Sequence, residues 1–477
     1  MMRAILITGF LFAWVAGGAD AQQRWDEIEY PPINEFEKPE LEFFELENGI
    51  RIYLVEDDEL PVVNLYTVIR TGGVQVPDDK TGLHSITGTV MRTGGPESMS
   101  GDDLNEMLEN KAARIETGIG FSSGSAALNV LKEDFDVLLP IFVEVLTNPA
   151  FPEEKINLAK IQQKSTISRR NDDQTRIANR EFQKLIYGKD SVYGRNSEYE
   201  TIDNITRTDL VDFHASAFVG ENMMVGVTGD FDMEEMRKTL VSAFGGLPAG
   251  EKTELLFPAV DYEFLSTINF IDKRDVNQST VLLGHIGGRR DNPDYAKLQV
   301  MNRILSGGFS GRLLQVVRSE MGLAYSVFGS YGSNNFYPGI FSAGVMTRSA
   351  TTGEAIQAVR NEIERLQDEP VSEEELNRTK ERFLNSIVFE YDSRESVLRE
   401  RMNNDYAGLP PDTFDRLVEE IRTVTAEDVR EVAQKYLRPD SVQILVVGNG
   451  EEIGDQLSRF GEVNEIDISI PPPPENN

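Results

Sequence analysis

The stretch ITRTDLVDFHASAFVGENMMVGVTGDF, from Ile205 to Phe231, returns in altered form as VTAEDVREVAQKYLRPDSVQILVVGNG, from Val424 to Gly450. The two segments align without a gap, and the clearest corresponding pairs are Thr206 with Thr425, Asp209 with Asp428, and Gly229 with Gly448. Each segment predicts a helix with a threonine N-cap and an acidic residue three positions later. An apolar strand that ends in glycine follows each helix. The match therefore indicates two copies of one structural unit.

Shorter matches extend the duplication over most of the chain. FPEEKI from Phe151 resembles VSEEEL from Val371, and each opens a helix with acidic residues in its first turn. VPDD from Val76 and NPDY from Asn292 form a weaker pair. A repeat of this length is a domain rather than a solenoid unit. We predict a signal peptide at 1–21, a first domain at 27–250, a linker at 251–261, a second domain at 262–465 and a disordered tail at 466–477.

Both halves mix strands with helices. NGIRIYLVED from Asn48 and VVNLYTVIR from Val62 read as strands joined by a short turn, and SAALNVL from Ser125 alternates as a strand. EELNRTKERFLNSIVFEY from Glu374 has helical apolar spacing. These patterns predict an α+β fold in which each half is an antiparallel or mixed sheet covered by helices.

Composition limits the classes of partner. The chain has 47 basic and 80 acidic residues, a net charge of −33, which argues against nucleic-acid binding and permits a basic peptide. It has no cysteine, which excludes disulfides, thiolate metal sites and a cysteine nucleophile.

The N-terminus predicts export. Arg3 precedes the apolar run AILITGFLFAWVAGG, and ADA follows at 19–21, the pattern of a secretory signal peptide. Cleavage after Ala21 leaves a periplasmic protein that starts at Gln22. An uncleaved anchor is the alternative, although the run is short for a span of ~20 residues. We expect no membrane span after cleavage.

The order of these segments resembles the M16 metallopeptidase family, which includes pitrilysin, insulin-degrading enzyme and the mitochondrial processing peptidase, and it is most similar to the small bacterial M16B type. The opening NGIRIYLVEDDELPVVNLYTVIRTGG from Asn48, the duplication, and GRLLQVVRSEMGLAYSV from Gly311 carry the resemblance. It implies two homologous domains that form half of a clamshell around an extended peptide.

Active members of that family carry H-x-x-E-H on the helix after the second strand. In GLHSITGT, from Gly82 to Thr89, the resemblance places Ser85, Gly88 and Thr89 at the three chemical positions. Helical geometry puts this face opposite the apolar side, free of the core; the apolar side holds Leu83, Ile86, Val90 and Met91. Zinc binds imidazole, thiolate or carboxylate, which this face lacks.

The resemblance also implies a third ligand, a glutamate, within KINLAKIQQKSTISRRNDDQ from Lys155. No acidic residue lies between Lys155 and Asn171, and Ser165 or Thr166 occupies the matching position. A register shift to His84 finds only Thr87 and Gly88 as partners. His214 and His285 lie in other segments, where a structural role is expected. We therefore expect no metal and no cofactor in this chain.

A second set of family residues is retained. The resemblance implies a substrate site with Arg318 and Tyr325, spaced R-x6-Y, whose side chains donate hydrogen bonds to a carbonyl oxygen that gains negative charge. Without the resemblance, Arg318 reads as a surface ion pair and Tyr325 as a half-buried strand residue. LSGGFSGR from Leu305 resembles the family's flexible substrate loop, with the alternative of a helix C-cap and turn; its glycines are Gly307, Gly308 and Gly311.

The chain lacks the zinc ligands but retains the arginine and tyrosine of the substrate site. In this it resembles the zinc-less subunit of a two-chain peptidase. We expect a zinc-bearing M16 partner, in a heterodimer or larger complex, and a peptide or unfolded polypeptide as substrate, bound by β-addition to an edge strand. The alternative is a peptide-binding or chaperone-like module without enzymatic role, as a homodimer for example.

GFSSG, 120–124, also fits G-x-S-x-G around Ser122, but that motif requires a preceding strand and a following helix. Here a helical pattern precedes it and a strand follows, so a serine hydrolase is disfavoured.

Overall fold

The computed structural model describes residues 39–390 and 393–472. The predicted signal peptide and the last residues of the predicted tail, 473–477, lie outside the described residues. The first half contains the strands β1 (Glu42–Glu45), β2 (Arg51–Glu56), β3 (Val62–Ile69), β4 (Arg114–Ile119), β5 (Gly124–Leu131) and β6 (Met223–Gly229). Its helices are α1 (Leu83–Gly94), α2 (Gly101–Asn110), α3 (Phe135–Thr147), α4 (Glu153–Ser168), α5 (Gln174–Tyr187), α6 (Tyr199–Asp203), α7 (Arg207–Ala217) and α8 (Met233–Phe244).

The second half repeats this succession. Its strands are β7 (Thr267–Asp272), β8 (Gln278–Ile286), β9 (Gly288–Arg289), β10 (Ala324–Tyr331), β11 (Ser333–Asn334), β12 (Ile340–Arg348), β13 (Gln443–Gly448) and β14 (Val463–Glu465). Its helices are α9 (Tyr295–Ser306), α10 (Thr352–Asp368), α11 (Glu373–Glu390), α12 (Arg394–Ala407), α13 (Thr413–Thr423), α14 (Ala426–Tyr436) and α15 (Gly450–Ile453). The helix predicted around residues 374–391 is α11.

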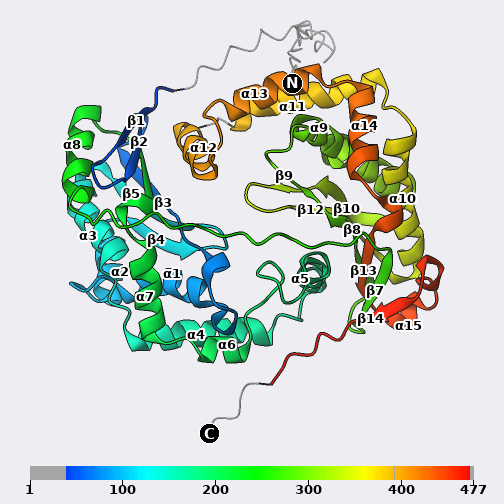
Figure 1. Ribbon diagram of the computed structural model, residues 1–477, viewed down its shortest axis with the longest axis horizontal. Coiled ribbons are helices and arrows are strands. Elements are labelled where there is room, and N and C mark those ends of the chain that lie inside the picture. Colours follow the sequence, from blue (N-terminus) through cyan, green and yellow to red (C-terminus); the bar gives the residue numbers. More distant parts are fainter. Residues whose placement is uncertain (1–38, 391–392, 473–477) are drawn as a thin grey trace, which may run out of the picture. The chain divides into compact units, whose positions relative to one another are not determined.

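The two large sheets have matching topologies (Figure 1). The first has the order β1-β2-β6-β3-β5-β4, and the second contains the corresponding series β7-β13-β8-β12-β10. In the matching series β2-β6-β3-β5-β4 and β7-β13-β8-β12-β10, the first pair is parallel and the others are antiparallel. β1 adds to β2 in the antiparallel direction. The prediction of two homologous α+β domains with mixed sheets covered by helices is confirmed.

The duplicated stretch forms α7 and β6 in one half and α14 and β13 in the other. Thr206 and Thr425 are the N-caps, and each exchanges hydrogen bonds in a capping box with the aspartate three residues later. Every residue of β6 and β13 is buried. The sequence pattern therefore predicted both helix starts and both central strands.

β2 and β3 are joined by a short turn, as predicted. They do not pair with each other, because β6 lies between them and pairs with both. Its place between β2 and β3 agrees with the complete burial of β6.

The GFSSG segment lies in the turn between the antiparallel strands β4 and β5. Ser122 offers its backbone oxygen to the Tyr406 hydroxyl. Since a strand rather than a helix follows the motif, the segment is not a nucleophile elbow, and the serine-hydrolase interpretation fails.

One helix of each half packs against the sheet of the other half: α12 packs on the first sheet and α5 on the second (Figure 1). Along β2, Ile52 and Leu54 face the core of the first domain, whereas Tyr53 and Val55 face α12 of the second half. In return α5 packs on the second sheet, and the apolar residues of that contact are Ile177, Phe182, Ile186, Leu282, Leu445 and Val447. This exchange covers the second face of each sheet at its central strands, whereas β4, β5 and β10 keep exposed residues on one face.

The start of the predicted tail packs against the domains. Ile466 and Ile468 contact the α5 cluster, and Ile470 contacts the core of the first domain. The Asn171 amide donates to the Ile468 carbonyl at 2.6 Å. Because every second residue from 466 to 470 is an isoleucine, one side of this extended segment is apolar and packs on the protein. Residues 466–470 are therefore ordered, whereas the sequence predicted disorder. None of the helices in the described part of the chain is long and apolar enough to cross a membrane.

Candidate functional site

Helix α1 holds the positions that the family resemblance assigns to zinc chemistry. It follows β3, as predicted, and its apolar side is buried; those residues are Leu83, Ile86, Val90 and Met91. Ser85 and Thr89 are partly exposed on the other side. Gly88, which was predicted to be free of the core, is buried.

Strand β4 covers α1 at Gly88. A Cβ atom on Gly88 would lie 2.5 Å from the Ile119 nitrogen and 2.9 Å from the Gly118 Cα. The Thr117 hydroxyl also donates to the Gly88 carbonyl at 2.6 Å. The helix and strand backbones are therefore in direct contact, and no space remains for a glutamate at the general-base position.

The hydroxyl groups on and near the Ser85–Thr89 face of α1 form local hydrogen bonds. The Thr89 hydroxyl donates to the Ser85 carbonyl at 2.9 Å, within its own helix. The Ser85 hydroxyl accepts a hydrogen bond from the Gln163 amide of α4 at 3.1 Å. Thr166 is exposed and donates to the Gln162 carbonyl at 3.1 Å. The α4 residue that contacts the α1 face is thus Gln163, which the sequence alignment missed.

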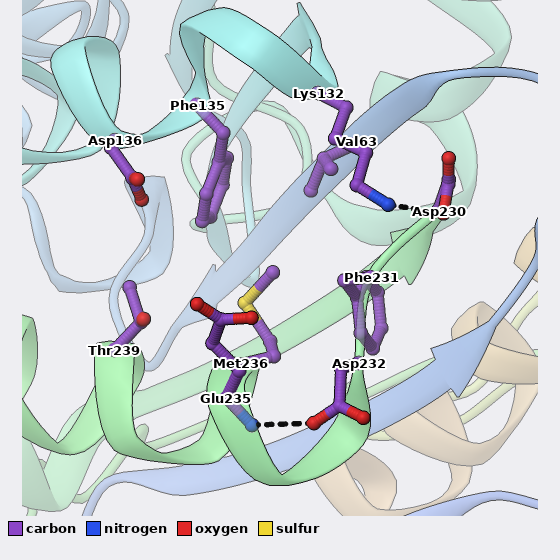
Figure 2. Close-up of a pocket in the computed structure, with 10 residues that line it drawn as sticks. All are labelled: Val63, Lys132, Phe135, Asp136, Asp230, Phe231, Asp232, Glu235, Met236 and Thr239. Carbon is purple, nitrogen blue, oxygen red and sulfur yellow. Dashed lines mark hydrogen bonds and ion pairs between the residues drawn. The ribbon is translucent and has the colours of Figure 1, made fainter.

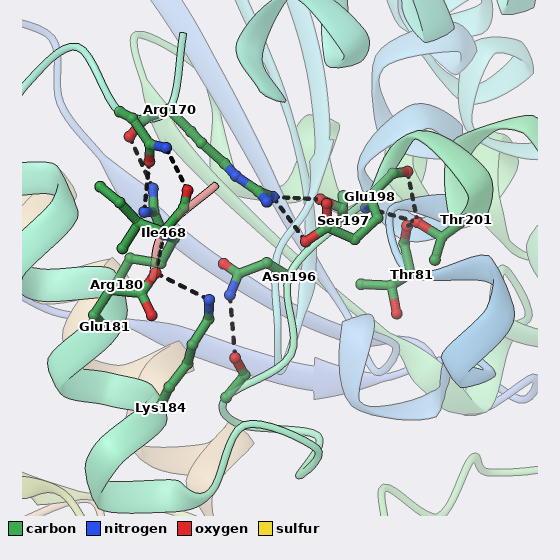
Figure 3. Close-up of polar contacts among 12 residues, drawn as sticks. Thr81, Arg170, Arg180, Glu181, Lys184, Asn196, Ser197, Glu198, Thr201 and Ile468 are labelled. Atoms are coloured by element: carbon green, nitrogen blue, oxygen red, sulfur yellow. Dashed lines mark hydrogen bonds and ion pairs between the residues drawn. The ribbon is translucent and has the colours of Figure 1, made fainter. Parts of the chain in front are cut away.

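Polar contacts fix α1 and α4 relative to each other (Figure 3). The Thr201 hydroxyl donates to the Thr81 carbonyl, just before α1, at 2.9 Å. Arg170, just after α4, pairs with Glu198 at 2.8 Å, and its side chain is only 13% exposed. Glu198 is also the N-cap residue of α6. The face between α1 and α4 is consequently a fixed structural contact.

The three histidines do not assemble into a metal site. The His214 ring nitrogen bonds the Leu146 carbonyl at 2.7 Å, and His285 bonds the Ile286 carbonyl at 2.7 Å. Burial, with the Arg195 charge as the second cause, lowers the pKa of His84 to about 4. Within the described ranges, no group of three His, Cys, Asp or Glu side chains is placed to hold a metal ion. The donors at Ser85, Gly88 and Thr89 do not fit zinc.

The retained pair lies in the second half, after the glycine-rich loop. α9 ends at Ser306, and the short helix η6 (Gly308–Ser310) follows with Gly308 at a φ of 68°. This is the predicted helix end and turn. Arg312 is buried and holds Glu375 of α11 through two hydrogen bonds of 2.9 and 2.8 Å. The loop is therefore anchored directly before the segment that carries Arg318.

Arg318 lies on the π-helix η7 (Leu314–Glu320), a form that recurs at functional sites. Its guanidinium carbon is 5.2 Å from the centre of the Tyr325 ring and 5.7 Å from that of Phe309. Within residues 39–390 and 393–472, Arg318 makes no ion pair. The structure thus brings Arg318 and Tyr325 together and leaves the hydrogen-bonding groups of the arginine free.

Tyr325 occupies a bulge on β10, an edge strand of the second sheet. Ala324 pairs with Thr347 and Ser326 with Met346, so that Tyr325 is the extra residue and is 77% exposed. A bulge redirects a side chain and is common at sheet edges near functional sites. Two further phenylalanines that the sequence did not single out are also exposed: Phe309 of η6 at 81% and Phe328 of β10 at 43%.

Comparison with known sequences finds M16-type proteins. Residues 204–383 match the profile of a family described as Peptidase M16 inactive domain. A protein called Non-peptidase homolog YmxG, from Helicobacter pylori, is 23% identical over 397 residues, which cover 83% of this chain and 90% of that protein. The Uncharacterized zinc protease YmxG of Bacillus subtilis is 22% identical over 407 residues, covering 85% of this chain and 97% of that protein.

Solved structures share the fold. The peptidase M16 inactive domain from Pseudomonas fluorescens superposes with a TM-score of 0.78 at 23% identity, covering 86% of this chain and 98% of that chain. The periplasmic protease PqqL from Escherichia coli superposes with a TM-score of 0.73 at 16% identity, covering 88% of this chain and 49% of that chain.

Proposed function

We propose that this chain, whose residues 204–383 match the Peptidase M16 inactive domain profile, is the zinc-less, non-catalytic subunit of a heteromeric zinc metalloendopeptidase. In this role it binds peptide and presents Arg318 and Tyr325 to the zinc site of an intact M16 partner. The partner supplies the metal, and this chain supplies hydrogen-bond donors.

The contrast between the two halves supports this role. On α1 the positions for zinc chemistry are closed by the backbone of β4 at Gly88. At β10 the Tyr325 ring is exposed, and the half-buried Arg318 guanidinium of η7 lies beside it without an ion pair among the residues described. A half-buried arginine that lies over an exposed tyrosine, without an ion pair among the described residues, has no evident stabilising role in the isolated chain. This observation carries the proposal.

The chemical contribution follows from the donors. A phenol and a guanidinium donate hydrogen bonds to an amide carbonyl oxygen, and these bonds strengthen as negative charge develops on that oxygen. The unpaired side of β10 offers main-chain groups to an extended peptide. The same strand would thus orient the peptide and deliver the donors.

Export to the periplasm is part of the proposal. Its support is the N-terminal pattern of Arg3, an apolar run and ADA at 19–21. The structural neighbour PqqL is itself described as a periplasmic protease.

A second candidate is a peptide-binding, chaperone-like module without enzymatic role. The exposed aromatic side chains Phe309, Tyr325 and Phe328 favour it, because they suit the capture of apolar segments in unfolded chains. The Helicobacter pylori relative is described as a non-peptidase homolog. This role requires no partner with an intact zinc motif.

Purification of the tagged chain from its native cells separates the two candidates. The two-chain role predicts a co-purifying M16 chain with H-x-x-E-H, one zinc per complex, and peptidase activity that disappears when the tagged chain is removed. Peptide binding without such a partner, or a partner equally active alone, would favour the chaperone-like role.

A further inference from the structure

Helix α3 of the first domain has an apolar face that points away from the core. Its sequence, FDVLLPIFVEVLT, contains only two charged residues. Leu138, Phe142 and Val145 are fully buried in the core. On the outer side, Val137 is 50% exposed and Pro140 is exposed. A helix that is apolar on all sides is normally covered on all sides.

A groove runs between this face and helix α8. It has a volume of about 610 Å³, and its lining residues are Asp136, Leu139, Pro140 and Val143 of α3 and Lys238, Thr239, Ser242 and Ala243 of α8. Apart from the exposed Lys238, the α8 residues are small or short, which keeps the groove open. Its apolar α3 wall, with Leu139, Pro140 and Val143, suits an amphipathic helix, which binds such grooves through side chains one turn apart.

The groove continues at one end into a pocket of about 250 Å³ that is rich in carboxylates (Figure 2). Its apolar floor is formed by Val63, Phe135, Phe231 and Met236. Asp136 from α3 and Glu235 from α8 border it, and neither forms an ion pair within the described parts of the chain. The only cation in the lining, Lys132, is bound by Asp230 at 2.6 Å. The pocket therefore carries uncompensated negative charge.

The second domain fills the corresponding place with its own residues. There α10 matches α3, Gly353 takes the place of Asp136, and the short α15 replaces α8. Gln456 accepts the Gly353 N–H at 3.0 Å, and the Arg459 guanidinium lies 2.8 Å from where a Cβ on Gly353 would be. The second domain thus fills this place with its own Arg459. The first domain instead has carboxylates around an open pocket.

We propose that the α3–α8 groove of the first domain binds a basic amphipathic helix of a partner protein. A lysine or arginine of that helix occupies the pocket between Asp136 and Glu235, and its apolar side chains lie along Pro140 and Val143. The four carboxylates at the pocket, Asp136, Asp230, Asp232 and Glu235, outnumber the two lysines of the pocket and groove, Lys132 and Lys238, so charge complementarity selects a basic segment. The net charge of −33 favours its approach. The groove lies on different elements from Arg318 and Tyr325, so this inference does not rest on the proposed peptidase role.

The test measures binding of a fluorescent amphipathic helical peptide of leucine and lysine to the mature chain by anisotropy. The groove variant D136N/E235Q removes two charges from the pocket. The matched control E106Q/E109Q removes two charges from exposed positions on α2. We expect the groove variant to weaken binding about tenfold, which corresponds to ~1.4 kcal/mol, and the control to weaken it less than about twofold.

Two further arms localise the binding. T239R places an arginine one turn from Glu235, and we expect it to fold normally and to block the peptide. Hydrogen exchange should show peptide-dependent protection in α3 and α8. Equal losses in the two double variants, a scrambled peptide that binds equally well, protection at β10 instead, or no saturable binding would each overturn the proposal.

Discussion

Replacing Gly88 by alanine tests whether the zinc-helix position is closed by packing as well as changed in sequence. The new Cβ atom would lie 2.5 Å from the Ile119 nitrogen and 2.9 Å from the Gly118 Cα, and both are backbone atoms of the β4 edge. A flexible side chain could turn away, but a backbone can relieve this contact only by moving. The Thr117 hydrogen bond to the Gly88 carbonyl further limits such movement.

The expected magnitude follows from two opposing terms. Overpacking a well-packed site costs ~1–3 kcal/mol. Alanine in place of glycine within a helix returns ~1 kcal/mol. Since the contact is with backbone, the cost lies in the upper part of its range, and we expect G88A to lower the free energy of unfolding by ~1–2 kcal/mol.

The assay is denaturant unfolding of the mature chain followed by circular dichroism. G246A is the matched control, because a Cβ on Gly246 meets no atom within 4 Å, and we expect a change under ~0.5 kcal/mol. If G88A were as stable as the wild type or gained ~1 kcal/mol, as an open helical site would, the inferred contact between α1 and β4 would be wrong.

Three other outcomes are expected. Metal analysis of the purified chain should find little zinc, and peptides should stay intact in its presence; one chelator-sensitive zinc per chain would contradict this. Mass spectrometry of periplasmic material should find a chain that starts near Gln22, whereas an intact N-terminus in membranes would indicate an anchor. Burial, with Arg438 as a lesser cause, lowers the pKa of His285 to about 4, so its stabilisation is complete above pH ~6.5 and declines as the pH falls to ~4. The free energy of unfolding of the wild type should therefore fall with acid by ~3 kcal/mol more than that of H285Q. The same pH profile for both proteins would refute this.

Local patterns in the sequence predicted a large part of the fold. The capping pairs at Thr206 and Thr425 marked helix starts because each hydrogen bond lies within four residues. The spacing of Leu83, Ile86 and Val90 identified the buried side of α1 for the same reason. The pairing of Arg318 with Tyr325 also came from a short spacing, combined with the family resemblance.

Other features depend on contacts between distant segments. The approach of β4 to Gly88 joins residues of two separate elements, and a glycine in a helix does not by itself indicate what covers it. The contact of Gln163 with Ser85 likewise arises from the packing of α4 on α1. The exchange of α5 and α12 could not be predicted, because an amphipathic helix does not specify which of two similar apolar sheets it covers.

The turnover of the reconstituted two-chain complex with Y325F tests the central claim most directly. The substitution removes one hydroxyl from an exposed ring, so assembly, checked separately, should be normal. Loss of one donor to the developing oxyanion typically costs ~2.7–4 kcal/mol, and we expect turnover to fall ~100- to 1,000-fold with little change in peptide affinity. Turnover within about twofold of the wild type, with normal assembly, would contradict the shared site.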